Sequence, residues 1–309
     1  QYFTHLFIYN KMESLSIYQT TAQLLKAKLA DYIQLVKLRL SLLVVFSAAM
    51  AYLWASNRHV DAATIWLISL GGFMITGSAN ILNQIIEKDS DKLMKRTAKR
   101  PLPDGRMKVS EAMILACVLG IAGLLLLAKV NALCTILGAT AIFIYAGIYT
   151  PLKKITHLTV IPGAIAGSLP VVIGCVAALG KLTPEALVLF SIQFMWQFPH
   201  TWSIAWLLDD EYNKAGIKMM PTESGRSKTS ALIILASTFL IIPTGLLLYM
   251  YNSAGISVSW LLTIAGIGMV VFAYKLYKSR TPKSALGLMF GSFAYLPFVL
   301  IVLVIAKFI

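Results

Sequence analysis

The sequence predicts an all-α integral membrane protein with nine transmembrane helices. Of its 309 residues, 58% are hydrophobic and only 13% are charged, whereas about a quarter of the residues in soluble domains are charged. A water-soluble fold of this length could not bury so much apolar surface. The apolar residues also fall into stretches of about 20, the length that a helix needs to cross a membrane. These observations exclude a cytosolic enzyme, a secreted disulfide scaffold and a nucleic-acid-binding module.

Nine stretches of the chain have this length and composition. They lie near residues 40–56, 64–86, 111–128, 131–150, 159–179, 185–208, 229–250, 257–277 and 285–306. Little more than Lys129 and Asn131 separates the third from the fourth, which predicts a tight helical hairpin.

A different pattern precedes the first span. Residues 17–39 mix apolar and basic side chains at helical spacing, which is typical of an amphipathic helix at the membrane surface. We therefore divide the chain into an N-terminal segment, residues 1–39, and a nine-helix domain, residues 40–309.

The basic residues predict the orientation of these spans. All but four of the 27 Lys and Arg residues fall in the N-terminal segment or in the loops after the second, fourth, sixth and eighth spans; the exceptions are Arg58, Lys129, Lys181 and Lys307. Loops rich in Lys and Arg remain on the cytoplasmic side of a membrane. We therefore expect the N-terminus on that side, or its equivalent, and the C-terminus across the membrane.

Acidic residues gather where two spans leave the membrane on this basic side. The first group has the spacing Asn83-x-x-x-Glu87-x-x-x-Asp91, which places three oxygen-bearing side chains on one face of a helix. Oxygen ligands without His or Cys suit Mg²⁺, which keeps several waters and bridges to phosphate. Arg96 and Arg100 follow, and guanidinium groups bind phosphate through paired hydrogen bonds. This segment predicts a site for a metal-bound diphosphate.

The second acidic group, Asp209, Asp210 and Glu211, ends the sixth span. A single acidic cluster near basic residues is ordinarily a solvated loop face, but two clusters on one side favour a shared site. We expect Asp210 and Glu211 to bind a second metal ion, although any of the three acids could do so. Lys153, in the loop after the fourth span, would add a cation for the phosphate.

Both acid-bearing segments resemble the signatures of a known family. Residues 83–103, NQIIEKDSDKLMKRTAKRPLP, are similar to the first signature of the UbiA superfamily of intramembrane prenyltransferases. Within them, D-x-x-M-x-R-T-x-x-R-P resembles the protohaem IX farnesyltransferases (haem O synthases). Residues 196–221, which begin WQFPH, resemble the second signature of that family, and residues 149–174 also resemble it. The resemblance extends from about residue 31 to the end, with Glu87 and Glu211 where Asp is usual.

The resemblance implies a UbiA-type bundle around a central apolar cavity. Members of this family transfer a farnesyl group from farnesyl diphosphate to a vinyl group of haem B. Water adds, and the products are haem O, which is used to build haem A for haem–copper oxidases, and diphosphate. The resemblance further implies Mg²⁺ as the cofactor, a bacterial or mitochondrial inner membrane, and acidic motifs facing the cytoplasm or matrix. Haem A synthase or a terminal oxidase would be a partner, and nucleic acid would not.

This chemistry implies roles for individual residues. Negative charge develops on the diphosphate as its bond to the farnesyl group breaks, and bound cations stabilise that charge. The expected diphosphate-binding residues are Arg96, Arg100 and Lys153. The expected metal ligands are Asn83, Glu87, Asp91, Asp210 and Glu211. The expected catalytic residues are Asn83, Glu87, Asp91 and His200.

The sixth span supplies most of the expected haem and prenyl pocket, which comprises Tyr149, Trp196, Gln197, His200 and Trp202. Aromatic faces could stabilise an allylic cation, although any single aromatic residue could equally be ordinary packing. A histidine within a membrane span is seldom without function. His200 could bind the haem iron or move a proton when water adds.

Three other functions compete with this interpretation. Another UbiA-type enzyme would use the same diphosphate site with an aromatic quinone precursor as acceptor, but W-Q-x-P-H favours haem. A transporter built from repeats would place broken helices at matching depths in mid-membrane, whereas these acids lie at span exits. A haem-binding assembly factor without catalysis would leave the metal-ligand spacing unexplained.

Overall fold

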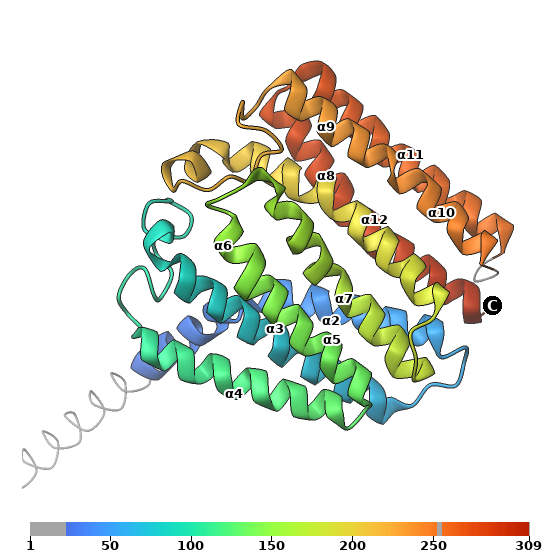
Figure 1. Ribbon diagram of the computed structural model, residues 1–309, viewed down its shortest axis with the longest axis horizontal. Coiled ribbons are helices and arrows are strands. Elements are labelled where there is room, and N and C mark those ends of the chain that lie inside the picture. The colour runs from blue at the N-terminus through green and yellow to red at the C-terminus, as the bar shows by residue number, and fades with distance from the viewer. Residues whose placement is uncertain (1–22, 252–254, 309) are drawn as a thin grey trace, which may run out of the picture.

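The computed structural model describes residues 23–251 and 255–308, and the regular structure within these ranges is entirely helical (Figure 1). Residues 23–35 form a helix where the amphipathic segment is expected, and residues 17–22 of that segment lie outside the described residues. The elements that follow are α2 (Leu38–Ala55), α3 (Ala62–Asp91), α4 (Val109–Ala128), α5 (Ala132–Ile142), η1 (Phe143–Tyr149), α6 (Thr150–Leu152), η2 (His157–Thr159), α7 (Val160–Leu179), α8 (Pro184–Lys214), α9 (Lys228–Phe239), α10 (Ile241–Met250), α11 (Ile256–Ser279) and α12 (Pro282–Phe308).

The predicted fold class is confirmed. Within the described ranges, eight helical segments are long and apolar enough to cross a membrane, and each overlaps one predicted span. The remaining predicted span, residues 185–208, coincides with α8, which has 31 residues. It falls short of that measure of apolarity because Gln193, Gln197 and His200 interrupt its apolar residues.

Two rings of helices share the pair α2 and α7. In one ring α2 packs on α7, α7 on α8, α8 on α12, and α12 on α2. In the other ring α2 packs on α3, α3 on η1, η1 on α7, and α7 on α2. Figure 1 shows α7 and α8 between the C-terminal helices α10 to α12 and the group formed by α3, α4 and α5. This arrangement surrounds a central space with side chains from both halves of the chain.

The fourth span changes its helical geometry before it ends. Residues 143–149 form a π-helix, and the Thr150 backbone N–H donates to the Tyr145 carbonyl. Pro151 follows, and because proline has no N–H it cannot continue the usual i→i−4 pattern. The Thr150 hydroxyl also donates to the Tyr145 carbonyl, at 2.8 Å. A π-helical turn is frequent at functional sites, and this one leads directly into Lys153.

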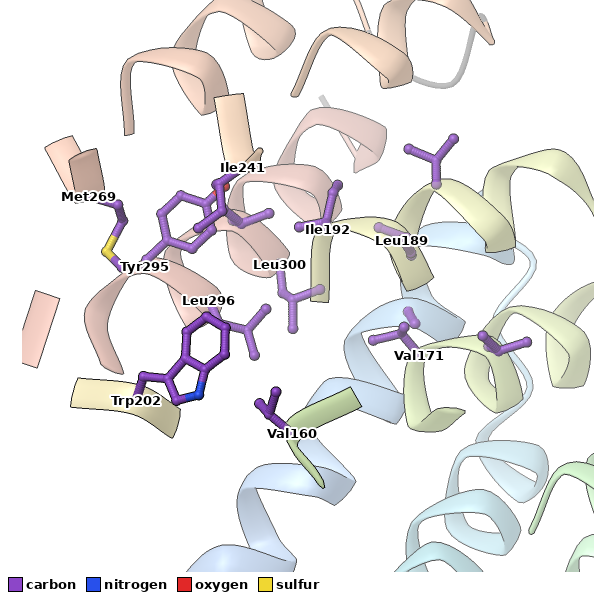
Figure 2. Packing of buried hydrophobic residues seen from close by; sticks show 14 of the residues in the cluster. Val160, Val171, Leu189, Ile192, Trp202, Ile241, Met269, Tyr295, Leu296 and Leu300 are labelled. Carbon is purple, nitrogen blue, oxygen red and sulfur yellow. The ribbon is translucent and has the colours of Figure 1, made fainter. Parts of the chain in front are cut away.

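The largest buried apolar cluster lies mainly between the C-terminal helices and the α7–α8 pair. Figure 2 shows part of this cluster, with labelled side chains from α7 (Val160, Val171), α8 (Leu189, Ile192, Trp202), α10 (Ile241), α11 (Met269) and α12 (Tyr295, Leu296, Leu300). It holds α8 firmly against α12 and thereby fixes the helix face that borders the central space.

The α2–α7 contact depends on a glycine and yields a stability prediction. A Cβ atom at Gly174 would collide with the Ala48 carbonyl oxygen, whereas a Cβ at Gly268 of α11 would meet no atom within 4 Å. We expect Gly174→Ala to lower the free energy of unfolding by roughly 1–3 kcal/mol, because overpacking forces the two helices apart. The thermal midpoint of the detergent-solubilised protein measures this effect. Gly268→Ala should leave the midpoint unchanged or raise it, and an equal loss in both variants would contradict the argument.

Candidate active site

The three oxygen-bearing residues of the first acidic motif lie on one face at the end of α3, as their spacing predicts. Asn83 and Asp91 are 1% exposed and Glu87 is 6% exposed. Burying a carboxylate to this extent costs free energy unless opposite charges or hydrogen-bond donors compensate it. The groups that surround them therefore define the site.

A separate cationic side chain contacts each of these three residues. The Lys37 ammonium donates to Asn83 Oδ1 at 3.1 Å, Lys153 Nζ lies 2.8 Å from Glu87 Oε1, and Arg100 Nη1 lies 2.7 Å from Asp91 Oδ2. The sequence predicted Arg100 and Lys153 as phosphate-binding residues. The structure places both in this cluster, in contact with the carboxylates.

Lys37 is a site residue that the sequence did not reveal. It lies in the turn immediately before α2 with a left-handed backbone (φ 50°), and in the sequence it was one basic residue among many on that side. Burial of its ammonium group, together with the nearby charges of Arg100 and Lys153, lowers the pKa of Lys37 to about 7. Its position directly before the first span was the only signal that could have marked it.

The two acidic motifs meet at one end of the bundle. The Arg96 backbone N–H donates to Glu211 Oε2 at 3.3 Å, which joins the loop after α3 to the last turn of α8. A hydrogen bond from the Thr97 hydroxyl to the Asp91 carbonyl, at 2.8 Å, folds this loop back on α3. Residues about 115 positions apart in the chain therefore border the same site.

The other two acids of the second motif turn away from this junction. The Asp210 side chain is 77% exposed and pairs with Arg226 at 3.1 Å. Asp209 is buried, but it lies against the loop at Gly225 in a separate pocket of about 300 Å³. Side chains of consecutive helix residues point about 100° apart, so two adjacent acidic side chains are poorly placed to bind the same metal ion. Of the three acids, Glu211 faces the first motif, whereas Asp210, which we expected to share a metal ion with it, pairs with Arg226.

A cavity of about 380 Å³ lies inside the bundle, and it comes next to the charged residues at Tyr149, whose ring contacts the Lys153 ammonium group. Side chains from α2, α3, η1, α7, α8 and α12 line it, and they include Tyr149, Trp196, Gln197 and His200 from the expected pocket. Its wall is close-packed: the Gln193 amide donates to the Gly167 carbonyl at 2.6 Å, and a Cβ at Gly167 would collide with Gln197.

Trp202 lies elsewhere, which corrects its predicted place in the pocket. It is 6% exposed and belongs to the buried apolar cluster of Figure 2. Because it is two residues beyond His200, its side chain is rotated by about 200° around α8. The sequence pattern alone did not show which side of α8 would face the cavity.

The oxygen-bearing side chains of this site suit a magnesium ion whose remaining ligands come from water and from a substrate. Within residues 23–251 and 255–308, no three His, Cys, Asp or Glu side chains form a closed metal cage. Glu87 and Asp91 offer two carboxylates, and Asn83 adds an amide oxygen on the same face. Mg²⁺ is commonly bound by one or two carboxylates, with waters and phosphate oxygens as its remaining ligands.

Comparison with known sequences identifies the family. Residues 44–304 match the UbiA prenyltransferase family. A protein from Cytophaga hutchinsonii named protoheme IX farnesyltransferase is 47% identical over 89% of this chain and 97% of its own length. A Flavobacterium johnsoniae protein of the same name is 40% identical over 92% of this chain and 97% of its own. A mitochondrial one from Arabidopsis thaliana is 34% identical over 86% of this chain and 62% of its own.

Solved structures share the fold. One described as a digeranylgeranylglyceryl phosphate synthase superimposes with a TM-score of 0.76 at 20% identity, covering 91% of this chain and 99% of that one. A UbiA homolog from Archaeoglobus fulgidus, bound to GPP and Mg²⁺, superimposes with a TM-score of 0.64 at 15% identity, covering 88% and 99%. At these identities the likeness establishes the bundle and not the substrate.

The buried Glu87–Lys153 pair provides a test of the charge cluster. We expect Lys153→Met to lower the free energy of unfolding by about 3–5 kcal/mol, because it leaves a buried carboxylate without its partner. Thermal unfolding in detergent measures the loss. The neighbouring Lys154 is exposed, so Lys154→Met is the matched control and should have little effect. The double variant Glu87→Gln/Lys153→Met should recover most of the loss; a double variant as unstable as Lys153→Met would contradict the pairing.

Proposed function

The chain belongs to the UbiA prenyltransferase family, and we propose that it transfers a farnesyl group from farnesyl diphosphate to a vinyl group of haem B, with addition of water, to give haem O and diphosphate. The observation that carries the proposal is the Arg96–Glu211 contact, which joins the two acidic motifs over an apolar cavity. Relatives at 40–47% identity, named protoheme IX farnesyltransferase, support haem as the acceptor over an aromatic quinone precursor. Family membership also disfavours a transporter.

The charged end of the cavity has the groups that a diphosphate requires. Lys153 and Arg100 pair with the two carboxylates, and Lys37 adds a third basic group, whose pKa is lowered to about 7. A bound anion favours the protonated form of Lys37, so these groups attract the anionic end of the substrate and stabilise the leaving group as negative charge develops on it. Asn83, Glu87 and Asp91 would hold Mg²⁺, with Glu211 available from the second motif, and the bound ion would supply further neutralisation of the diphosphate.

The apolar part of the cavity has the complementary role. Once the bond between farnesyl C1 and the diphosphate oxygen breaks, an allylic cation remains and must be shielded from water. The Tyr149 ring lies where the charged end meets this part, since the Lys153 ammonium is 4.4 Å from its centroid. The vinyl π-electrons form the new carbon–carbon bond, water then adds to the cation left on the porphyrin substituent, and one proton is released. Tyr149 and Trp196 offer aromatic faces to these cations.

We place the protein in the inner membrane of a bacterium or a mitochondrion. The distribution of Lys and Arg supports an orientation with the N-terminus and both acidic motifs on the cytoplasmic or matrix side. The product would pass to haem A synthase or to a terminal oxidase, because haem O is an intermediate that another protein must use.

The proposed reaction is tested by expression in a host that lacks its own haem O synthase. Extracted haems should contain a species in which a hydroxyethylfarnesyl group replaces one vinyl group. Mass spectrometry should show it to be heavier than haem B by one farnesyl group and one hydroxyl group. We expect Asp91→Asn to abolish this species while the protein remains folded in the membrane. Prenylated quinone precursors without haem O would show that the acceptor is aromatic, and full activity of Asp91→Asn would contradict the site.

The second motif predicts different effects for adjacent acids. We expect Glu211→Gln to reduce farnesyl transfer by about 10–100-fold, as is usual when a group that supports a metal site is lost. Asp210→Asn should retain activity, because Asp210 is exposed and paired with Arg226. Assays of membranes with farnesyl diphosphate, haem B and a series of Mg²⁺ concentrations measure both variants. Equal losses in the two would mean that the motif acts as one cluster.

A further inference from the structure

One residue of α12 contacts two side chains of the W-Q-x-P-H segment that line the cavity. The Trp196 indole N–H donates to the Ser292 carbonyl at 2.8 Å, and His200 Nδ1 lies 2.8 Å from the Ser292 hydroxyl oxygen. Ser292 itself is fully buried. No sequence pattern associated this serine with the site, because its partners lie more than 90 positions away.

The hydrogen bonds of Ser292 favour one tautomer of His200. The Ser292 hydroxyl donates to the Met289 carbonyl at 2.6 Å. A serine hydroxyl has a single proton and two acceptor lone pairs. With that proton directed to Met289, the oxygen can only accept from His200. This arrangement favours the tautomer with the proton on Nδ1 and the lone pair on Nε2.

The packing of His200 fixes the orientation of its ring. Trp196 stacks on one face, with centroids 4.4 Å apart and an interplanar angle of 16°. Phe293 meets the ring at 79°, with centroids 4.9 Å apart. These contacts and Ser292 are all uncharged, which favours a neutral imidazole. Within the described residues Nε2 has no hydrogen bond, and His200 lines the cavity.

We propose that Ser292 is a positioning residue that holds His200 as the Nδ1–H tautomer, so that Nε2 is presented to the cavity as a ligand for the haem iron. This inference rests on the proposed function only for the identity of the metal. A neutral imidazole binds a metal through its unprotonated nitrogen, and the hydrogen bond made by the other nitrogen decides which one that is. The same bond disfavours His200 as a proton donor from Nε2, because that nitrogen has no proton to give.

The tautomer can be measured without any activity. The chain has four histidines, so nitrogen-15 labelling of histidine in the detergent-solubilised protein gives few signals, and His200→Gln assigns the relevant pair. We expect Nδ1 of His200 to be protonated and Nε2 unprotonated. Ser292→Ala should move both shifts toward a mixture of tautomers, and Ser292→Thr, which keeps the hydroxyl, should restore them. A ring protonated at Nε2, or shifts unchanged in Ser292→Ala, would overturn the proposal.

The matched control removes a comparable hydroxyl elsewhere. Thr238 of α9 is buried and donates to the Ile234 carbonyl at 2.7 Å, as Ser292 donates to Met289. Thr238→Val should leave the His200 shifts unchanged. Shifts of equal size in Thr238→Val and Ser292→Ala would show that any buried deletion disturbs the ring, and would overturn the specific role of Ser292.

Haem titration then tests the ligand assignment. Ferric haem B added to the purified protein, without prenyl diphosphate, should give the absorption spectrum of an imidazole-ligated haem. We expect His200→Gln to abolish this spectrum and Ser292→Ala to weaken haem affinity by about 10–100-fold, as loss of a hydrogen bond to a metal ligand does; Ser292→Thr should recover most of it. An unchanged spectrum in His200→Gln would overturn iron ligation even if haem O is produced. Ligation and tautomer retained in a protein that makes no haem O would refute only the proposed function.

Discussion

The rest of this structure depends on one constraint: the charged side chains buried at one end of an apolar bundle must neutralise one another. Glu87 and Asp91 are almost inaccessible, and cations pair with them from the loop after α3 and from the loop after α6. Lys37, in the turn before α2, donates to the neighbouring Asn83. These contacts join all three segments to the end of α3. Arg100 and Lys153 balance the two carboxylates, and Lys37, with its pKa lowered to about 7, gains a proton readily when an anion binds beside it. A diphosphate that brings its own metal ion is an anion of this kind.

The sequence predicted what depends on local periodicity. Apolar length located the nine helices, and i, i+4 spacing correctly placed Asn83, Glu87 and Asp91 on one face of α3. It could not predict which face of α8 borders the cavity, so Trp202 was wrongly assigned to the pocket. The ion pair of Asp210 with Arg226 could not be predicted either, because it depends on how the loop of residues 215–227 folds back on α8.

Residues such as Lys37 and Ser292 were missed because their importance is entirely tertiary. A lysine before a membrane span ordinarily sets topology, and a serine in an apolar helix ordinarily bonds to its own backbone. Ser292 does form such a bond, to the Met289 carbonyl, and neither residue has a sequence neighbour that marks a second role. Only the packing of α2 and α12 on the helices that carry the motifs gives these residues a partner.

The charged residues lie at one end of the bundle, and the cavity that His200 lines is largely apolar. This environment favours a neutral imidazole. An allylic cation is stabilised by aromatic faces but is trapped by an exposed nucleophile, and an imidazole nitrogen with a free lone pair is such a nucleophile. Coordination to iron occupies that lone pair and removes the hazard. A haem held by His200 Nε2 would thus place its own vinyl group as the available nucleophile, provided that it binds before the diphosphate leaves. On this view the hydrogen bond between His200 and Ser292 would protect the reaction as well as orient the acceptor, because it would leave Nε2 facing the iron.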